Sequence, residues 1–199
     1  MPPPSPTSLL LVDGGSQKTP SLALILRDLG FPPHTISLFS LQEADIAAAD
    51  ALILSGGPHL FTAKHESDQA ELRKAFSFLK GPSPPTFGIC LGFQALVWAA
   101  GGEVRRGPER RTEDRIDFVR AGHPLLDGIP SGSSFCEDHC EEVVLPPTFE
   151  LLAISKHCPV EIAACQGNQR YGVQFHPESS GRRGKQLLQN ALHLLFPPS

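Results

Sequence analysis

A cysteine held between two glycines, where a short apolar run meets an apolar helix, constrains the fold of this chain more than any other feature. It lies in the segment from Thr86 to Gln94, TFGICLGFQ. A strand that reverses sharply into a helix brings the flanking residues into collision unless they are glycine, and Gly88 and Gly92 occupy those positions. The turn leaves Cys90 beside the N-terminus of a helix expected over 91–100, whose partial positive charge favours the thiolate. The stretch therefore predicts a reactive cysteine, whereas an isolated cysteine at the end of a core strand is usually buried and inert.

A histidine and a carboxylate much later in the chain supply the partners that such a cysteine needs. The segment from Tyr171 to Glu178, YGVQFHPE, predicts a strand that ends in His176, with Glu178 two residues later. A cysteine nucleophile requires a base, and the base requires a group that orients its ring. Cys90, His176 and Glu178 are therefore the candidate catalytic residues, although His176 without these neighbours would be interpreted as an ordinary histidine at a strand end.

Strands and helices alternate along the first half of the chain, which is typical of an α/β fold with a parallel sheet. Strands are expected at 9–12, 34–40, 51–54 and before Cys90, and helices at 19–29, 42–49 and 64–79. Short alternating runs at 103–106, 115–119, 133–136, 150–154, 160–164 and 170–175 then predict a small antiparallel extension, and a helix is expected over 185–196. We expect a single three-layer domain over residues 8–199, with a mostly parallel central sheet and helices on both faces, preceded by a disordered or extended proline-rich tail over residues 1–7.

Charge and cysteine content narrow the possible partners. With 17 basic and 21 acidic side chains the net charge is −4, which indicates neither a nucleic acid nor a membrane partner. No apolar run approaches the roughly 20 residues that cross a bilayer, and the N-terminus lacks a signal-peptide pattern. The five cysteines are not spaced like those of a secreted scaffold, so we expect a reducing compartment and a cytoplasmic protein. The spacing of Cys136, His139, Cys140 and Cys158 matches no common zinc site, and we expect no metal.

The cysteine and histidine motifs together resemble the paired signature of the class I, or triad-type, glutamine amidotransferases. These motifs are Gly88–Gln94 and Gly172–Glu178; the resemblance covers nearly the whole chain and is closest to the glutaminase subunit or domain of GMP synthase. It implies a flavodoxin-like fold and matches the segment Ser55-Gly56-Gly57-Pro58 to the family's oxyanion loop. By this resemblance the amides of Gly57 and Leu91 form the oxyanion hole, and the substrate-binding residues are Gly56, Gln94, Asp138 and His139.

The resemblance also implies a reaction and a partner. The chain would hydrolyse glutamine to glutamate and ammonia through the Cys-His-Glu triad and a γ-glutamyl thioester. No glycine-rich ATP-pyrophosphatase loop or other nucleotide site is recognisable in the sequence, so we expect no cofactor in this chain. The ammonia would then pass to a separate ATP-pyrophosphatase synthetase subunit. The acceptor reaction favoured by the resemblance is GMP synthesis from XMP.

One departure from the family pattern keeps other functions open. GMP synthase relatives typically have Ser-His and then an aspartate two residues later, and this chain has Asp138-His139-Cys140-Glu141. A carboxylate in place of the hydroxyl would alter how the pocket recognises the charges of free glutamine. The alternative function is a stand-alone γ-glutamyl peptidase or hydrolase with the same triad, and a second alternative is a non-catalytic binding module on the same fold. The arginines between Arg105 and Arg115 either face a partner or nucleotide or form a solvated surface.

Overall fold

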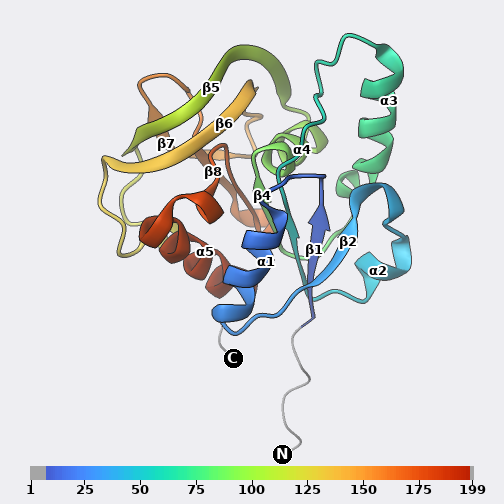
Figure 1. Cartoon of the computed structure of the whole chain (residues 1–199), viewed down its shortest axis with the longest axis horizontal. Helices are drawn as coiled ribbons and strands as arrows, with labels where there is room; N and C mark the ends of the chain where they lie inside the picture. Colours follow the sequence, from blue (N-terminus) through green and yellow to red (C-terminus); the bar gives the residue numbers. More distant parts are fainter. Residues whose placement is uncertain (1–7, 198–199) are drawn as a thin grey trace, which may run out of the picture.

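Nine strands form one mixed sheet in the computed structural model, which describes residues 8–197 (Figure 1). Their order is β2-β1-β3-β4-β9-β8-β7-β5-β6. Neighbours from β2 to β9 pair in parallel, and neighbours from β9 to β6 pair antiparallel. The strands are β1 (Leu9–Asp13), β2 (His34–Ser37), β3 (Ala51–Leu54), β4 (Thr86–Ile89), β5 (Glu103–Phe118), β6 (Ser133–Val144), β7 (Glu150–Ser155), β8 (Ile162–Cys165) and β9 (Arg170–Val173). The proline-rich tail expected over residues 1–7 lies outside the described residues.

Helices cover both faces of the parallel half of the sheet, as Figure 1 shows. The helices are α1 (Thr19–Asp28), α2 (Glu43–Ala47), α3 (Glu66–Ala75), α4 (Leu91–Ala99) and α5 (Gly181–Leu195). Successive side chains of a strand point to opposite faces, so Leu9 and Leu11 of β1 pack with α1 and α5, whereas Leu10 and Val12 pack in a second core with α3 and α4. The two cores on either side of one sheet confirm the predicted three-layer α/β class.

The antiparallel part is built around a long hairpin that the sequence pattern divides into separate short runs. The runs expected at 103–106 and 115–119 are the two ends of β5, which pairs with β6 along most of its length. Gly107 and Pro108, which follow the first of these runs, lie where the β5–β6 register shifts between Arg106 and Arg110. The chain therefore forms a bulge here rather than ending the strand, and the hairpin continues past it with Arg111 directly opposite Asp138.

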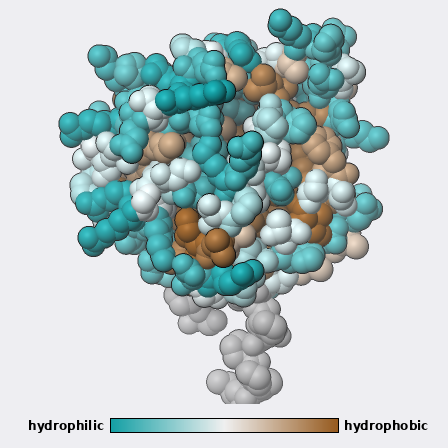
Figure 2. Space-filling model, viewed as in Figure 1, coloured by the Kyte–Doolittle hydropathy of each residue, from teal (hydrophilic) through white to brown (hydrophobic). Residues whose placement is uncertain are grey.

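The face of the molecule seen in Figure 2 carries both polar and apolar residues. Figure 2 shows hydrophilic residues over most of this face, with apolar atoms visible on the side of α2 and α3. A cavity of about 970 Å³ lies there, lined by residues that include Leu38, Phe39 and Phe78. No helix within residues 8–197 is long and apolar enough to cross a membrane.

The sheet order brings the two sequence motifs together. β4 and β9 are parallel neighbours, with Ile89 opposite Val173. The carboxyl ends of parallel neighbours meet at the same edge of a sheet, which is where ligands bind in open α/β folds. Cys90 follows β4 directly and His176 follows β9 by three residues, so both lie at this edge.

Candidate active site

Cys90 occupies a strained turn between β4 and α4. Its backbone has φ 50° and ψ −105°, a conformation that is uncommon for any residue except glycine. The two flanking glycines are required by packing: a Cβ on Gly88 would lie 2.6 Å from the backbone nitrogen of Phe93, and one on Gly92 would lie 2.4 Å from the carbonyl oxygen of Leu54. The strain and the close packing hold the cysteine at the carboxyl edge of the sheet, as the sequence motif predicts.

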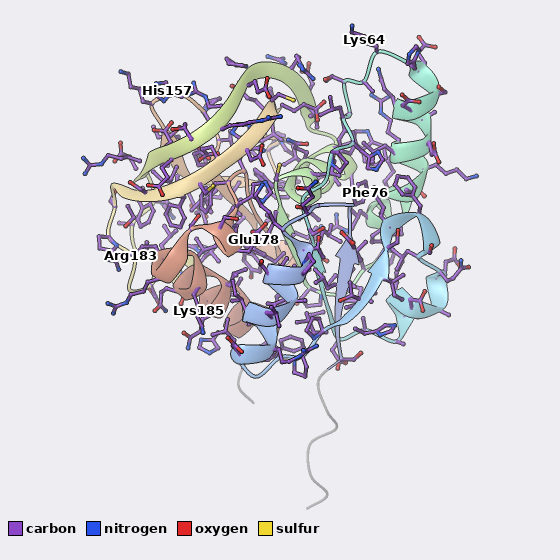
Figure 3. All side chains as sticks on the ribbon, viewed as in Figure 1. Lys64, Phe76, His157, Glu178, Arg183 and Lys185 are labelled. Atoms are coloured by element: carbon purple, nitrogen blue, oxygen red, sulfur yellow. The ribbon has the colours of Figure 1, made fainter. Side chains whose placement is uncertain are left out.

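A buried histidine and carboxylate stand next to this cysteine. His176 Nδ1 lies 2.7 Å from Glu178 Oε1, and both side chains are almost completely shielded from solvent. Glu178 lies near the middle of the molecule in Figure 3, whereas Lys64 and Arg183 extend from its periphery. Burial by itself lowers the pKa of His176, but hydrogen bonds to Cys90 and Glu178 and the charges of these two residues outweigh it and raise the pKa to about 10. The structure thus brings Cys90, His176 and Glu178 together and favours an imidazolium at neutral pH.

The glycine pair after β3, Gly56 and Gly57, packs against the site next to His176 and Cys90. A Cβ on Gly56 would lie 2.7 Å from Cε1 of the His176 ring, and one on Gly57 would lie 2.0 Å from the carbonyl oxygen of Gly14. Leu91 is the first residue of α4, so its amide has no hydrogen-bond partner within the helix. The structure therefore places the predicted oxyanion-hole residues, Gly57 and Leu91, around Cys90.

A cavity of about 450 Å³ opens in front of the cysteine. Gln94 lines it from α4; the residue is 2% exposed, and its Nε2 donates to the Glu141 carbonyl oxygen at 3.4 Å. Other lining residues include Lys18, Gly57, Cys90, Glu109, Arg111, Asp138, His139 and His176. The larger cavity beside α2 and α3 contains none of these side chains.

The two predicted binding residues on β6 have different surroundings. Asp138 forms an ion pair with Lys18 and lies 3.6 Å from Arg111 Nε. Partial burial opposes ionisation of Asp138, but Lys18, His176 and Arg111 outweigh it and hold the pKa of this carboxyl below its usual value. His139 is buried instead, with Nδ1 3.0 Å from the Glu141 carbonyl oxygen and Nε2 3.0 Å from Glu137 Oε2.

Several residues that form the site were not predicted from the sequence. Gln174 is fully buried, and its Nε2 donates to Cys90 Sγ at 3.8 Å. The period of two along a strand places Gln174 on the same face as His176, and this signal was available in the sequence. Glu141 accepts hydrogen bonds from the amides of Phe61 and Thr62 at 3.2 and 2.6 Å, and so joins β6 to the loop after the glycine pair.

Lys18 reaches Asp138 across 120 residues of sequence, so no local pattern reveals this contact. Arg111 is the member of the expected basic cluster that lines the cavity, whereas Arg105 pairs with Glu103 on the surface. The basic cluster is therefore divided between the site and the exterior.

The fold and the site define a class I glutamine amidotransferase. The family model described as glutamine amidotransferase class-I matches residues 10–195, and the chain belongs to this family. Among curated proteins, it is 32% identical over 186 residues to a subunit of the GMP synthase [glutamine-hydrolyzing] of Pyrococcus furiosus, covering 92% of this chain and 95% of that one. It is also 35% identical over 193 residues to the GMP synthase of Phenylobacterium zucineum, covering 93% of this chain and 36% of that protein. The chain thus spans about a third of the length of such full-length synthases.

Solved structures support the fold. A crystal structure described as that of a GMP synthase subunit from Thermoplasma acidophilum superposes with a TM-score of 0.84 at 24% identity, covering 96% of this chain and 94% of that one. A glutamine amidotransferase from Thermotoga maritima superposes with a TM-score of 0.78 at 16% identity, covering 96% and 99%. At these identities the likeness concerns the fold alone.

Proposed function

We propose that this chain is a glutaminase subunit that hydrolyses glutamine to glutamate and ammonia and supplies the ammonia to a separate ATP-dependent synthetase, which makes GMP from XMP. The observation that carries the proposal is that Cys90 and His176 line one cavity, next to the glycine pair, while Glu178 lies 2.7 Å from Nδ1 of the His176 ring. The match to single subunits of GMP synthase along almost their whole length supports the choice of acceptor.

The first half of the proposed reaction is acylation of the cysteine. The Cys90 thiolate attacks the γ-carbonyl carbon of glutamine, and the amides of Gly57 and Leu91 stabilise the resulting oxyanion. The imidazolium of His176 then donates its proton to the departing nitrogen, so that the carbon–nitrogen bond breaks and ammonia leaves. The products are ammonia, a γ-glutamyl thioester on Cys90 and a neutral His176.

The second half is hydrolysis of the thioester. Neutral His176 removes a proton from water, and the hydroxide attacks the thioester carbonyl. The carbon–sulfur bond breaks, glutamate is released, and the thiolate and imidazolium are restored. Glu178 holds the imidazole through Nδ1, which keeps Nε2 directed at the reacting atoms and stabilises the charged ring.

The acceptor of the ammonia is proposed from the relatives. The matching proteins of Pyrococcus furiosus and Methanococcus maripaludis are named as subunits of a glutamine-hydrolysing GMP synthase, which implies a second subunit in those enzymes. By analogy, a separate synthetase subunit would bind this chain and use its ammonia.

A γ-glutamyl hydrolase remains the second candidate, because Asp138 places a carboxylate where the family has a hydroxyl. Its charge is opposed by Lys18 and Arg111, so the cavity gains no uncompensated negative charge. The two candidates differ in the leaving group, and a panel of glutamine and γ-glutamyl dipeptides compares them directly.

The test of the proposal is glutamate release from glutamine by the purified chain, alone and with a candidate synthetase subunit. Cys90→Ala should abolish release, whereas Cys165→Ala, which alters a cysteine on β8 outside the cavity, should retain it. A diazoketone analogue of glutamine should add one label per wild-type chain at Cys90, detected by intact-mass and peptide mass spectrometry. Activity that survives Cys90→Ala would refute the mechanism.

A further inference from the structure

We propose that Lys18, Arg111 and Asp138 select the substrate by its α-carboxylate and α-ammonium groups, and so restrict this enzyme to γ-amides of free L-glutamate. The inference rests on the proposed function, since it concerns the recognition of a γ-glutamyl substrate at Cys90. It adds the specificity-determining side chains and the class of substrate that they accept.

The first observation is the position of Asp138. Its carbonyl oxygen lies 3.8 Å from Cys90 Sγ, so the residue begins next to the nucleophile. Its carboxylate lines the same cavity and is 39% exposed, and the Lys18 side chain that meets it is 26% exposed. The ion pair therefore lies on the wall of the cavity, where it is accessible to a ligand, rather than in the core.

The second observation is the balance of charge around this pair. Lys18 approaches Asp138 from the loop after β1, and Arg111 approaches it from the neighbouring strand β5, with Nε 3.6 Å from Oδ1. Arg111 also pairs with Glu109 at 3.0 Å, and all four side chains line the cavity. Two cations and two anions thus meet at one wall, which matches a ligand end that carries one charge of each sign.

The substrate can take the place of the partners within this ion pair. An ion pair that is partly exposed to solvent contributes little to stability, so opening it costs little. A glutamine whose γ-carbonyl carbon faces Cys90 presents its α-ammonium and α-carboxylate at the far end of a short chain. The ammonium replaces the Lys18 cation at Asp138, and the carboxylate takes the freed Lys18 and Arg111. Every charge that loses a partner gains another one from the substrate.

This arrangement defines which compounds are substrates. Free glutamine and γ-glutamyl peptides both keep the two α-groups, so both satisfy it. A glutamine inside a polypeptide has neither charge, since both α-groups are in peptide bonds, and entering the cavity would strip the charged side chains of water without replacement. The enzyme should therefore act on free γ-glutamyl compounds and not deamidate proteins.

The test pairs two residues with two substrate groups. The variants Asp138→Asn and Lys18→Met are assayed on glutamine, on Nα-acetylglutamine, which lacks the ammonium, and on glutamine α-amide, which lacks the carboxylate. Asp138→Asn should lower kcat/KM for glutamine by about 10- to 100-fold, mainly through KM, and should change the already low kcat/KM for Nα-acetylglutamine by less than about twofold. Lys18→Met should show the same selectivity with the α-amide.

The matched control is Lys185→Met, which removes a lysine of α5 from a surface ion pair with Asp28, outside the cavity (Figure 3). It should leave all three substrates unaffected. If turnover of the isolated chain is too slow to measure, the rate of Cys90 labelling by the diazoketone analogue and by its Nα-acetyl form gives the same comparison.

The outcomes separate the inference from the proposed function. Equal losses on glutamine and Nα-acetylglutamine, or no loss on either, would overturn the role of Asp138 while leaving glutamine hydrolysis intact. A wild-type chain that neither releases glutamate, with or without synthetase, nor reacts with the analogue would contradict the proposed function itself.

Discussion

Replacing Glu161 with glutamine should stabilise the protein against unfolding by an amount that grows as the pH rises. Glu161 lies just before β8 and is fully buried. Burial, with the nearby charge of Glu137, raises the pKa of Glu161 from 4.5 to about 9. The folded protein therefore holds this carboxyl protonated at neutral pH, whereas the unfolded chain ionises it. Glutamine has nearly the same shape and no proton to lose.

The magnitude follows from proton linkage. Because folding raises the pKa, the contribution of Glu161 to stability is complete below pH 4.5 and is lost as the pH rises through about 9. Between these limits the free energy of unfolding of the wild type falls by at most about 1.4 kcal/mol per pH unit through this group. From about pH 5 to about pH 8 the variant should therefore gain up to about 4 kcal/mol relative to the wild type.

The assay is urea unfolding at several pH values in this range, followed by the fluorescence of the single tryptophan, Trp98, and by circular dichroism. The same substitution at Glu71, an exposed residue of α3, serves as the control and should give a pH profile parallel to that of the wild type. A difference between Glu161→Gln and the wild type that stays constant with pH would show that the carboxyl is already ionised in the folded state, and would refute the reasoning.

Three further changes probe the site itself. Gly57→Ala introduces a Cβ that would lie 2.0 Å from the backbone carbonyl oxygen of Gly14, so the loop must move. Glutaminase kinetics should show kcat reduced by about 100-fold or more, and the melting temperature should fall because backbone has to shift. Glu178→Gln removes a charge that helps to raise the pKa of His176 to about 10, so the pKa of this imidazole should fall. An NMR titration that gives the same pKa in the variant and the wild type would contradict this prediction. Gln174→Leu removes the amide that donates to Cys90 at 3.8 Å, and should slow labelling of the thiol by the glutamine analogue about tenfold, as followed by intact mass; an unchanged rate would exclude this contribution.

The parts of this structure that the sequence predicted are those in which the backbone itself restricts the choice of residue. Gly88 and Gly92 are recognisable because the turn at Cys90 leaves no room for a Cβ, and the alternation of strands and helices shows the parallel half of the sheet. The adjacency of β4 and β9 is not local. A cysteine nucleophile's need for a base, together with the family resemblance, indicated that His176 meets Cys90.

The polar lining of the cavity was harder to predict. Lys18 stands in the loop after β1, and only the approach of this loop to β6 brings it to Asp138. The β5–β6 pairing brings Arg111 to the same carboxylate. The full length of β5 was not predicted, because Gly107 and Pro108 interrupt its alternating pattern at the bulge. Charged side chains carry no periodic signature of their partner, so the polar lining of the cavity depends on tertiary contacts that a pattern along the chain does not contain.

One histidine must act first as an acid and then as a base in the proposed mechanism, and the causes of its pKa explain how it does both. In the free enzyme, burial lowers the pKa of His176, and Cys90 and Glu178 together raise it to about 10, so the ring carries a proton ready for the leaving ammonia. Acylation converts the thiolate into a neutral thioester, which removes the contribution of Cys90 and leaves burial opposed by Glu178 alone. The pKa of the imidazole then falls, so after giving up its proton the ring stays neutral and activates water. In the proposed mechanism, hydrolysis regenerates the thiolate and with it the high pKa of His176, so the charge on one sulfur atom would drive the change of role.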